Sequence, residues 1–208
     1  MERVLDRVEL SEPQLRVMRM RPALVGKREA ATGVRRLFLG PLLPNPLVGR
    51  LPVAPAVSGL RVQLVHADDV ADAMCRALLD PAARGAYNLT AEPVLQPRDL
   101  ASALGANPLA VPARLARAAA DLSWRLHLQP TPAGWIDVAL EAPLVSAERA
   151  RRELGWQPAH DAHAVLAEVL EGLRAHADGP TPPLQATTSG PFRSRELATG
   201  IGARSGAS

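Results

Sequence analysis

The 208-residue sequence is poor in residue types that particular functions require. It has one cysteine, Cys75, which excludes a small secreted domain stapled by disulfides and favours a reduced, cytoplasmic environment. It also has a single tyrosine, Tyr87, and a single lysine, Lys27. The residue four positions after the tyrosine is Ala91. Chemistry that needs a tyrosine and a lysine four residues apart therefore cannot run on this chain.

Long apolar runs and clustered positive charge are missing as well. No stretch approaches the roughly 18 apolar residues of a membrane span, and the start has no apolar signal core. The net charge is only +3, and the arginines are scattered along the chain. A nucleic-acid binder would gather its excess charge on one face. We therefore expect no membrane and no nucleic-acid partner. The content of 47% hydrophobic and 22% charged residues is typical of a soluble globular protein.

The hydrophobic periodicity predicts an α/β protein. Residues 26–55 are rich in glycine and proline and are predicted to be irregular, apart from a short helical piece over 29–39. Residues 178–208 are predicted to be a disordered C-terminal tail, because they have almost no periodic apolar face. The predicted strands are 15–20, a mostly buried one, with 60–66 and 86–90; the predicted helices are 2–10, 69–79, 97–104, 112–128, 133–140, 148–154 and 162–176.

The densest polar cluster lies at residues 66–72. His66, Asp69 and Asp72 could suggest a metal site, but no further ligand stands at an obvious spacing. Asp68 or Asp69 as the N-cap of the following helix explains the pattern better. That helix should bury Val70, Met74, Ala77 and Leu78 and end at Gly85.

Other reactive side chains have equally plain interpretations. His160 and His163 are three residues apart at a helix start without a third ligand, so we expect surface histidines. Cys75 falls within a helix beside Met74 and is expected to be a small buried thiol. We predict no metal site and no catalytic residue in this chain.

Four segments occur in an order that is characteristic of one family. They are 16–26 with Arg21-Pro22, 62–71 with His66 and two aspartates, 85–89 with Tyr87-Asn88-Leu89, and 146–158 with Leu154-Gly155-Trp156. Together they resemble the C-terminal part of the NAD-dependent epimerase/dehydratase family, the extended short-chain dehydrogenases/reductases. The resemblance implies the C-terminal portion of a Rossmann-like doubly wound sheet with a small helical substrate lobe.

The resemblance also implies a division of roles among residues. It places Pro22, Leu24 and Val25 against the nicotinamide end of NAD or NADP. The same strand end has a purely structural alternative, a proline-terminated strand followed by a buried loop. The resemblance gives Gly26, Gln63 and His66, with the loop over 27–56, a place in the wall of the substrate crevice.

Two features of the family's pattern are missing. The family's glycine-rich nucleotide turn and its Tyr-x-x-x-Lys pair have no counterpart here, and Tyr87 and Lys27 stand at the wrong places. Nucleotide-sugar members often carry an arginine where this chain has Val62. We therefore expect a small-molecule substrate that is not a nucleotide sugar.

The sequence thus predicts a substrate-side portion over residues 1–177 followed by the tail. Such a portion is not catalytically competent alone and works within a longer enzyme or with a separately encoded nucleotide-binding half. Without its parallel neighbours, the strand near residues 15–20 should expose unpaired backbone. The alternative is a noncatalytic ligand-binding or interaction module derived from the same fold.

Overall fold

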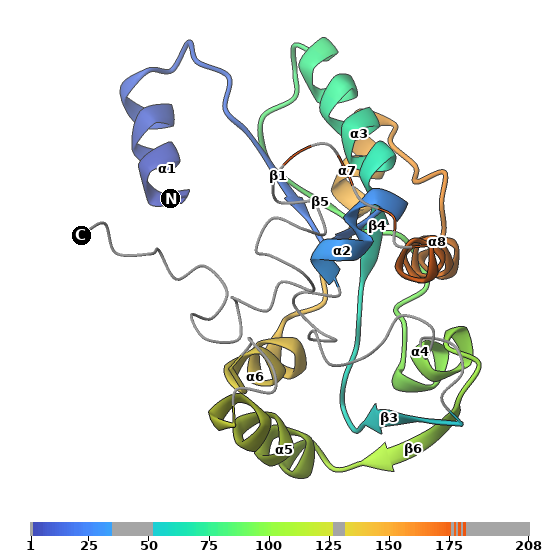
Figure 1. The fold of residues 1–208 in the computed structure, drawn as a ribbon. Coiled ribbons are helices and arrows are strands. Elements are labelled where there is room, and N and C mark those ends of the chain that lie inside the picture. Colours follow the sequence, from blue (N-terminus) through green and yellow to red (C-terminus); the bar gives the residue numbers. More distant parts are fainter. Residues whose placement is uncertain are drawn as a thin grey trace.

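We describe the protein from a computed structural model, which covers residues 2–34, 52–126 and 132–175 and residues 177, 179 and 181 (Figure 1). Within these residues the strands form three parallel pairs. The pairs are β1 (Met18–Pro22) with β5 (Gly85–Leu89), β2 (Leu24–Gly26) with β4 (Leu64–His66), and β3 (Val53–Val57) with β6 (Asn107–Val111). The predicted α/β class is confirmed. The predicted tail lies outside the described residues, apart from 179 and 181.

Helices connect and cover these strands. They are α1 (Glu2–Ser11), the 3-10 turn η1 (Arg28–Ala30), α2 (Ala31–Val34), α3 (Ala67–Leu79), α4 (Pro97–Ala103), α5 (Ala113–Arg125), α6 (Gly134–Glu141), α7 (Glu148–Leu154) and α8 (Ala162–Arg174). Local chemistry sets several ends. Pro97 occupies the first turn of α4, and Gly155 ends α7 in the left-handed conformation at φ 58°. The Asp161 side chain caps α8 by accepting from the Ala164 amide at 2.7 Å.

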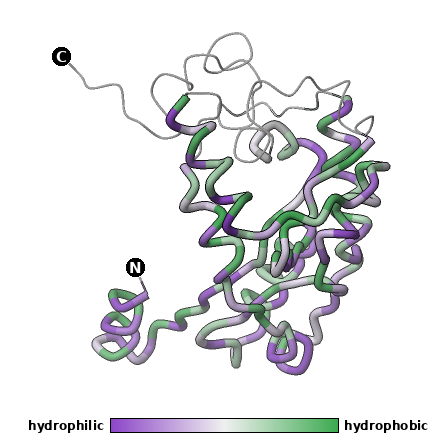
Figure 2. Tube along the Cα trace, turned by 90° about the horizontal axis from the view of Figure 1, so that it is seen from below, coloured by the Kyte–Doolittle hydropathy of each residue, from purple (hydrophilic) through white to green (hydrophobic). Residues whose placement is uncertain are grey.

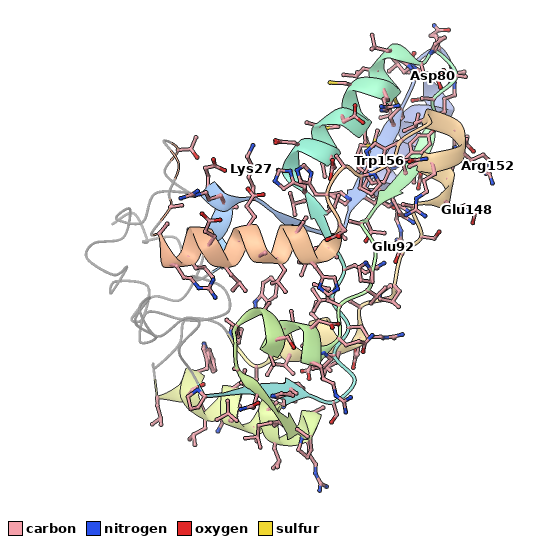
Figure 3. All side chains as sticks on the ribbon, turned by 90° about the vertical axis from the view of Figure 1, so that its right-hand side faces the viewer. Lys27, Asp80, Glu92, Glu148, Arg152 and Trp156 are labelled. Carbon is pink, nitrogen blue, oxygen red and sulfur yellow. The ribbon has the colours of Figure 1, made fainter. Side chains whose placement is uncertain are left out.

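The main core lies between the β1–β5 pair and the helices α3 and α7. Val65, Tyr87, Leu89 and Trp156 are all at most 1% exposed there. Trp156, the largest of them, lies between α3 and α7 (Figure 3), and its indole Nε1 donates to the Asp69 carbonyl at 2.9 Å. The Leu-Gly-Trp turn that the sequence singled out is therefore a packing element that holds two helices together.

Helix α8 packs closely on the second strand pair. A Cβ atom on Gly26 of β2 would lie only 2.5 Å from Val165 Cγ1 of α8. Only glycine therefore lets this helix approach the strand, and the approach brings α8 over the carboxyl ends of β2 and β4.

A smaller lobe contains α4, α5, α6 and the β3–β6 pair, away from the main core (Figure 1). The helical part of this lobe was predicted. The two strands were not, and β3 begins inside the segment over 26–55 that we expected to be irregular. Proline interrupts both strands, at Pro55 and Pro108, which hides the period-two pattern of a strand.

Several local predictions are wrong. Strand β1 is half-buried to exposed instead of mostly buried, and Gly85 begins β5 instead of ending the preceding helix. Helix α3 buries Asp69, Val70, Ala73 and Ala77, whereas Met74 and Leu78 are exposed. Cys75, expected to be buried, is also exposed. The helix is turned so that its alanines face the core.

Candidate functional site

The candidate site begins where the chain passes from the first strand pair to the second. The Ala23 amide donates to the Leu89 carbonyl at 2.8 Å, and the Leu24 amide donates to the Gln63 carbonyl at 3.2 Å. Within two residues the chain therefore passes from β1, which pairs with β5, to β2, which pairs with β4. Ligands of open parallel sheets bind outside the carboxyl ends of the strands, which is where this passage lies.

The predicted cofactor contacts stand on this passage with apolar surface uncovered. Pro22 is exposed at the end of β1, and the exposed fractions of Leu24 and Val25 are 52% and 43%. The structural alternative required a buried loop here, and these exposed side chains do not form one. Exposed branched side chains at strand ends are suited to contact one face of a flat ring. Their assignment to the nicotinamide stays a prediction.

Both ends of the Gln63 amide group bond to the backbone of Val145. Its Nε2 donates to the Val145 carbonyl at 2.9 Å, and its Oε1 accepts from the Val145 amide at 2.8 Å. This reciprocal pair ties β4 to the segment that follows α6. These two bonds use one N–H and one oxygen lone pair of the Gln63 amide.

His66 lies beside Gly26 in the strand register and is 3% exposed. Its Nδ1 accepts from the Asp68 amide at 3.2 Å, so His66 is the N-cap of α3. The predicted cap by Asp68 or Asp69 is wrong, because the buried His66 imidazole accepts the hydrogen bond of the free Asp68 amide instead. With Nδ1 as acceptor, the proton of the neutral ring sits on Nε2. Nε2 lies 3.1 Å from Glu168 Oε2 without the alignment of a hydrogen bond.

His160 belongs to the same cluster, although it was expected to be a plain surface residue. Its ring stacks on His66 with centroids 4.0 Å apart, and its Nδ1 lies 3.1 Å from Asp69 Oδ2. The Asp69 carboxylate is buried and also accepts from the backbone amides of Ala159 and His160. Two imidazoles, each beside a carboxylate, thus meet at the carboxyl end of β4.

A surface ion pair borders this cluster. Lys27 Nζ lies 2.7 Å from Asp68 Oδ1, between the start of α3 and α8 (Figure 3). The hydrogen bond between them raises the pKa of Lys27 and lowers the pKa of Asp68. Glu168, from the middle of α8, accepts from the Arg28 amide at 3.0 Å. Glu168 carried no local signal in the sequence, since it comes together with His66 only through the packing of α8.

The histidines and carboxylates of this cluster are not arranged to hold a metal ion within the described residues. Asp72, the third residue of the metal interpretation, pairs with Arg76 Nε at 2.7 Å on the exposed side of α3. Across residues 2–34, 52–126 and 132–175, no group of three or more histidine, cysteine or acidic side chains is arranged to hold a metal ion. The described helices also include none that is long and apolar enough to cross a bilayer.

Tyr87 belongs to the main core and lies away from the carboxyl ends of β2 and β4. It is buried within β5, where its hydroxyl accepts from the Arg84 amide at 3.3 Å and donates to Glu153 Oε2 at 3.2 Å. Burial raises its pKa. Lys27 is engaged with Asp68, so these two residues do not form a catalytic pair.

Comparison with known proteins gives three results. No family model matches the chain. Curated proteins of Mycobacterium bovis and Mycobacterium tuberculosis, described only as uncharacterized, are 30% identical over 166 residues. The match covers 79% of this chain and 17% of theirs, so the chain spans about a sixth of the length of these relatives.

Solved structures that are similar to the chain share its fold at low sequence identity. They include gox2253, with a TM-score of 0.55 and 20% identity. UDP-glucose 4-epimerase from Thermotoga maritima with UDP-glucose has a TM-score of 0.54 at 16% identity. UDP-glucose 4-epimerase from Stenotrophomonas maltophila with bound NAD has 0.52 at 16%. Each match covers 84% of this chain and between 51% and 54% of the solved one.

The fold therefore places the chain in a structural class. It has the Rossmann-like fold of the NAD-dependent epimerases and related short-chain dehydrogenase/reductase-like proteins. The chain spans about half the length of these solved structures.

Proposed function

We propose that the chain is the C-terminal, substrate-side portion of an NAD(P)-dependent epimerase/dehydratase-like oxidoreductase. Residues 1–177 form this portion, and 178–208 form a tail outside it. The observation that carries the proposal is the passage from β1 to β2, where exposed Leu24 and Val25 stand at the carboxyl ends of parallel strands. The four ordered sequence segments and the shared fold support it.

The residues present fit only one end of the cofactor. NAD or NADP, when bound, supplies hydride exchange at the nicotinamide ring. Leu24 and Val25 offer an apolar contact for that ring, and Pro22 ends the strand beneath it. This sequence has no glycine-rich turn for the pyrophosphate and no acidic residue at the matching place for the ribose. The nucleotide therefore needs a second part of the fold, within a longer enzyme or on a separate chain.

The same division applies to catalysis and substrate. We assign no catalytic residue to this chain, because the Tyr-x-x-x-Lys pair is missing from it. Gly26, Gln63 and His66 form one wall of the substrate crevice, the last two by positioning the neighbouring backbone. Val62 in place of an arginine cannot pair with a diphosphate, so the substrate is a small molecule other than a nucleotide sugar. The single cysteine supports a reduced, cytoplasmic environment for the protein.

Cofactor titration tests the proposal directly. Purified 1–208, titrated with NADH and NADPH while nucleotide fluorescence is followed, should show no saturable binding. Tight binding would refute the claim that the nucleotide part is missing. Translation of the genomic DNA before Met1 in the same frame is the second test. A Tyr-x-x-x-Lys placed directly before α1 supports a longer enzyme, whereas a stop codon leaves the two-chain arrangement.

A noncatalytic ligand-binding or interaction module is the second candidate. The engaged Gln63 amide and the His66–His160 cluster favour it, because both are internal contacts that stabilise the fold without a cofactor. The two candidates predict different NADH binding in the assembled protein, which includes the nucleotide-binding part. There, Val25→Asp should weaken NADH binding at least about tenfold if Val25 contacts the nicotinamide. Leu78→Asp, on exposed α3, should leave NADH binding unchanged.

A further inference from the structure

The contacts of the His66 ring suit only its neutral form. The side chain is 3% exposed, and its Nδ1 accepts from the Asp68 amide at 3.2 Å. A ring nitrogen can accept a hydrogen bond only while it carries no proton. The other nitrogen, Nε2, is buried and has no hydrogen-bond partner among the described residues. The N-cap of α3 therefore exists only as long as His66 stays uncharged.

A carboxylate oxygen lies close to each nitrogen of this ring. Glu168 Oε2 is 3.1 Å from Nε2, and Asp68 Oδ2 is 3.7 Å from Nδ1. Each carboxylate is held through its other oxygen. Glu168 Oε1 accepts from the Arg28 amide at 3.0 Å, and Asp68 Oδ1 lies 2.7 Å from Lys27 Nζ. A doubly protonated ring donates from both nitrogens, and an acceptor of opposite charge stands beside each one.

His160, stacked on His66, takes up a proton in a different way. Its Nδ1 lies 3.1 Å from Asp69 Oδ2. A carboxylate only accepts, so the proton of neutral His160 sits on Nδ1, and Nε2 keeps the lone pair that takes a second proton. The side chain is 38% exposed, so this proton comes from solvent without the loss of the contact to Asp69. With the ring centroids 4.0 Å apart, a charge on His160 opposes one on His66.

The charged groups that face the two rings come from the start of α3, from α8 and from the residue after β2. Among the described residues they are Asp68, Asp69, Glu168 and Lys27. The other charged groups nearby are engaged elsewhere: Arg28 with Glu171, Asp72 with Arg76, and Asp161 with the Ala164 amide. Helix α1 stands apart from the body in both views (Figures 1 and 2), and its acidic residues pair with arginines of β1. Three carboxylates and one ammonium group thus surround the rings, and their net negative charge favours the uptake of protons.

From this geometry we propose that the His66–His160 pair is a pH-sensitive clasp between α3 and α8. In the neutral state, His66 caps α3 through Nδ1. When the ring takes a second proton from solvent onto Nδ1, the hydrogen bond from the Asp68 amide breaks. The imidazolium then donates to the Asp68 and Glu168 carboxylates instead. The first turn of α3 loses its cap, while α3 and α8 gain a charged link.

The clasp works in a range of pH in which its acceptors stay ionised. Histidine is the side chain whose charge changes between about pH 5 and 8, whereas carboxylates become neutral near about pH 4. The hydrogen bond from Lys27 also lowers the pKa of Asp68, so this acceptor keeps its charge. Because Gly26 is the register partner of His66, the clasp stands at the carboxyl ends of β2 and β4. It needs no bound cofactor and goes beyond the proposed function.

Nitrogen NMR of histidine-labelled 1–208 tests the protonation states directly. At about pH 8, the His66 ring should carry its proton on Nε2 and none on Nδ1. At about pH 5, both nitrogens should be protonated. The signal that is missing from His66→Asn identifies this ring. A proton on Nδ1 in the neutral form, or a ring that stays neutral at about pH 5, would overturn the proposal.

Amide exchange tests the cap itself. Protection of the Asp68 amide, taken relative to its intrinsic exchange rate at each pH, should fall at least about fivefold from about pH 8 to about pH 5. The amides of Ala73 and Ala77, further along α3, should keep their protection. An equal loss at all three amides would mean that the whole helix opens, and it would contradict a switch at the cap.

Three variants distinguish the clasp from a cap without a switch. His66→Asn supplies an N-cap acceptor that does not titrate, so Asp68 protection should no longer depend on pH. Glu168→Gln removes the charge of one acceptor and should move the midpoint of the transition to lower pH. His163→Gln, exposed in the first turn of α8, is the matched control and should leave the midpoint unchanged.

Two outcomes of this comparison would overturn the proposal. One is a pH-dependent loss of Asp68 protection that persists in His66→Asn. The other is a midpoint that Glu168→Gln moves no more than His163→Gln does. None of these readouts involves nicotinamide or substrate, so a failure of the proposed cofactor function leaves the clasp separately decidable.

Discussion

Replacement of Asp69 by alanine tests how the His66–His160 cluster is held. The Asp69 carboxylate is 5% exposed and accepts from the Ala159 amide at 2.9 Å and from the His160 amide at 3.2 Å. It also lies 3.1 Å from His160 Nδ1. Asp69→Ala removes all three contacts. The loop between α7 and α8 then loses the acceptor that fixes it on α3.

The expected cost follows from these contacts. A hydrogen bond to a charged, buried acceptor contributes about 1.5 kcal/mol or more, so the two amides alone account for a loss of about 3 kcal/mol. For a chain of this size, that lowers the midpoint of thermal unfolding by about 6–12 °C. The isosteric Asp69→Asn keeps one acceptor and should lose about half as much free energy of unfolding.

Urea denaturation followed by circular dichroism measures the loss. The matched control is Asp72→Ala, one turn further along α3, where the carboxylate pairs with Arg76 on the exposed side. An exposed pair at this spacing contributes about 0.3–0.5 kcal/mol. If Asp69→Ala destabilises the chain no more than Asp72→Ala does, the carboxylate does not hold the loop and the reasoning fails.

Two further predictions concern packing and pH. Gly26→Ala should lower the free energy of unfolding by about 1–3 kcal/mol, because the added Cβ meets Val165. Gly33→Ala has open space around its Cβ and should be neutral or stabilising. Urea denaturation compares the two variants, and equal effects would contradict the packing of α8 on β2. Burial raises the pKa of Tyr87, so the folded state holds the phenolic proton more tightly than the unfolded chain does. Stability should therefore fall as pH rises from the ordinary tyrosine pKa through the raised one, and less so in Tyr87→Phe. Because the chain has a single tyrosine, ultraviolet absorbance follows its ionisation directly, and an unshifted titration would refute the prediction.

Sequence reasoning predicted the elements whose ends are set locally. Pro97 opens α4 and Gly155 ends α7, in agreement with the helices predicted over 97–104 and 148–154, because proline restricts φ and glycine tolerates the left-handed conformation. The expected helix over residues 2–10 is α1. The strand over residues 86–90 is β5, one residue earlier. These features depend on neighbours within a few positions.

The candidate site was harder to predict because its contacts join distant segments. His66 caps α3 instead of an aspartate, since the fold buries its ring beside the free amide. Asp69 is then available to bind the amide of His160, 91 residues away. Glu168 reaches the cluster only because Gly26 lets α8 approach. Cys75 is exposed because the alanine side of α3 faces the core, and helical periodicity alone did not distinguish the two orientations.

The sequence by itself determined the class of the chain and its chemical limits. One tyrosine and one lysine at unsuitable positions exclude the catalytic pair, and four ordered segments resemble a family with a Rossmann-like fold. Only the tertiary structure decided which edges of the β1–β5 pair are covered by other described residues. Arg149 covers β5 from α7, while Met18 and Met20 direct their backbone groups outward. Composition and local pattern limit the chemistry that a residue offers. Whether its polar groups find hydrogen-bond partners depends on which segments the fold brings beside that residue.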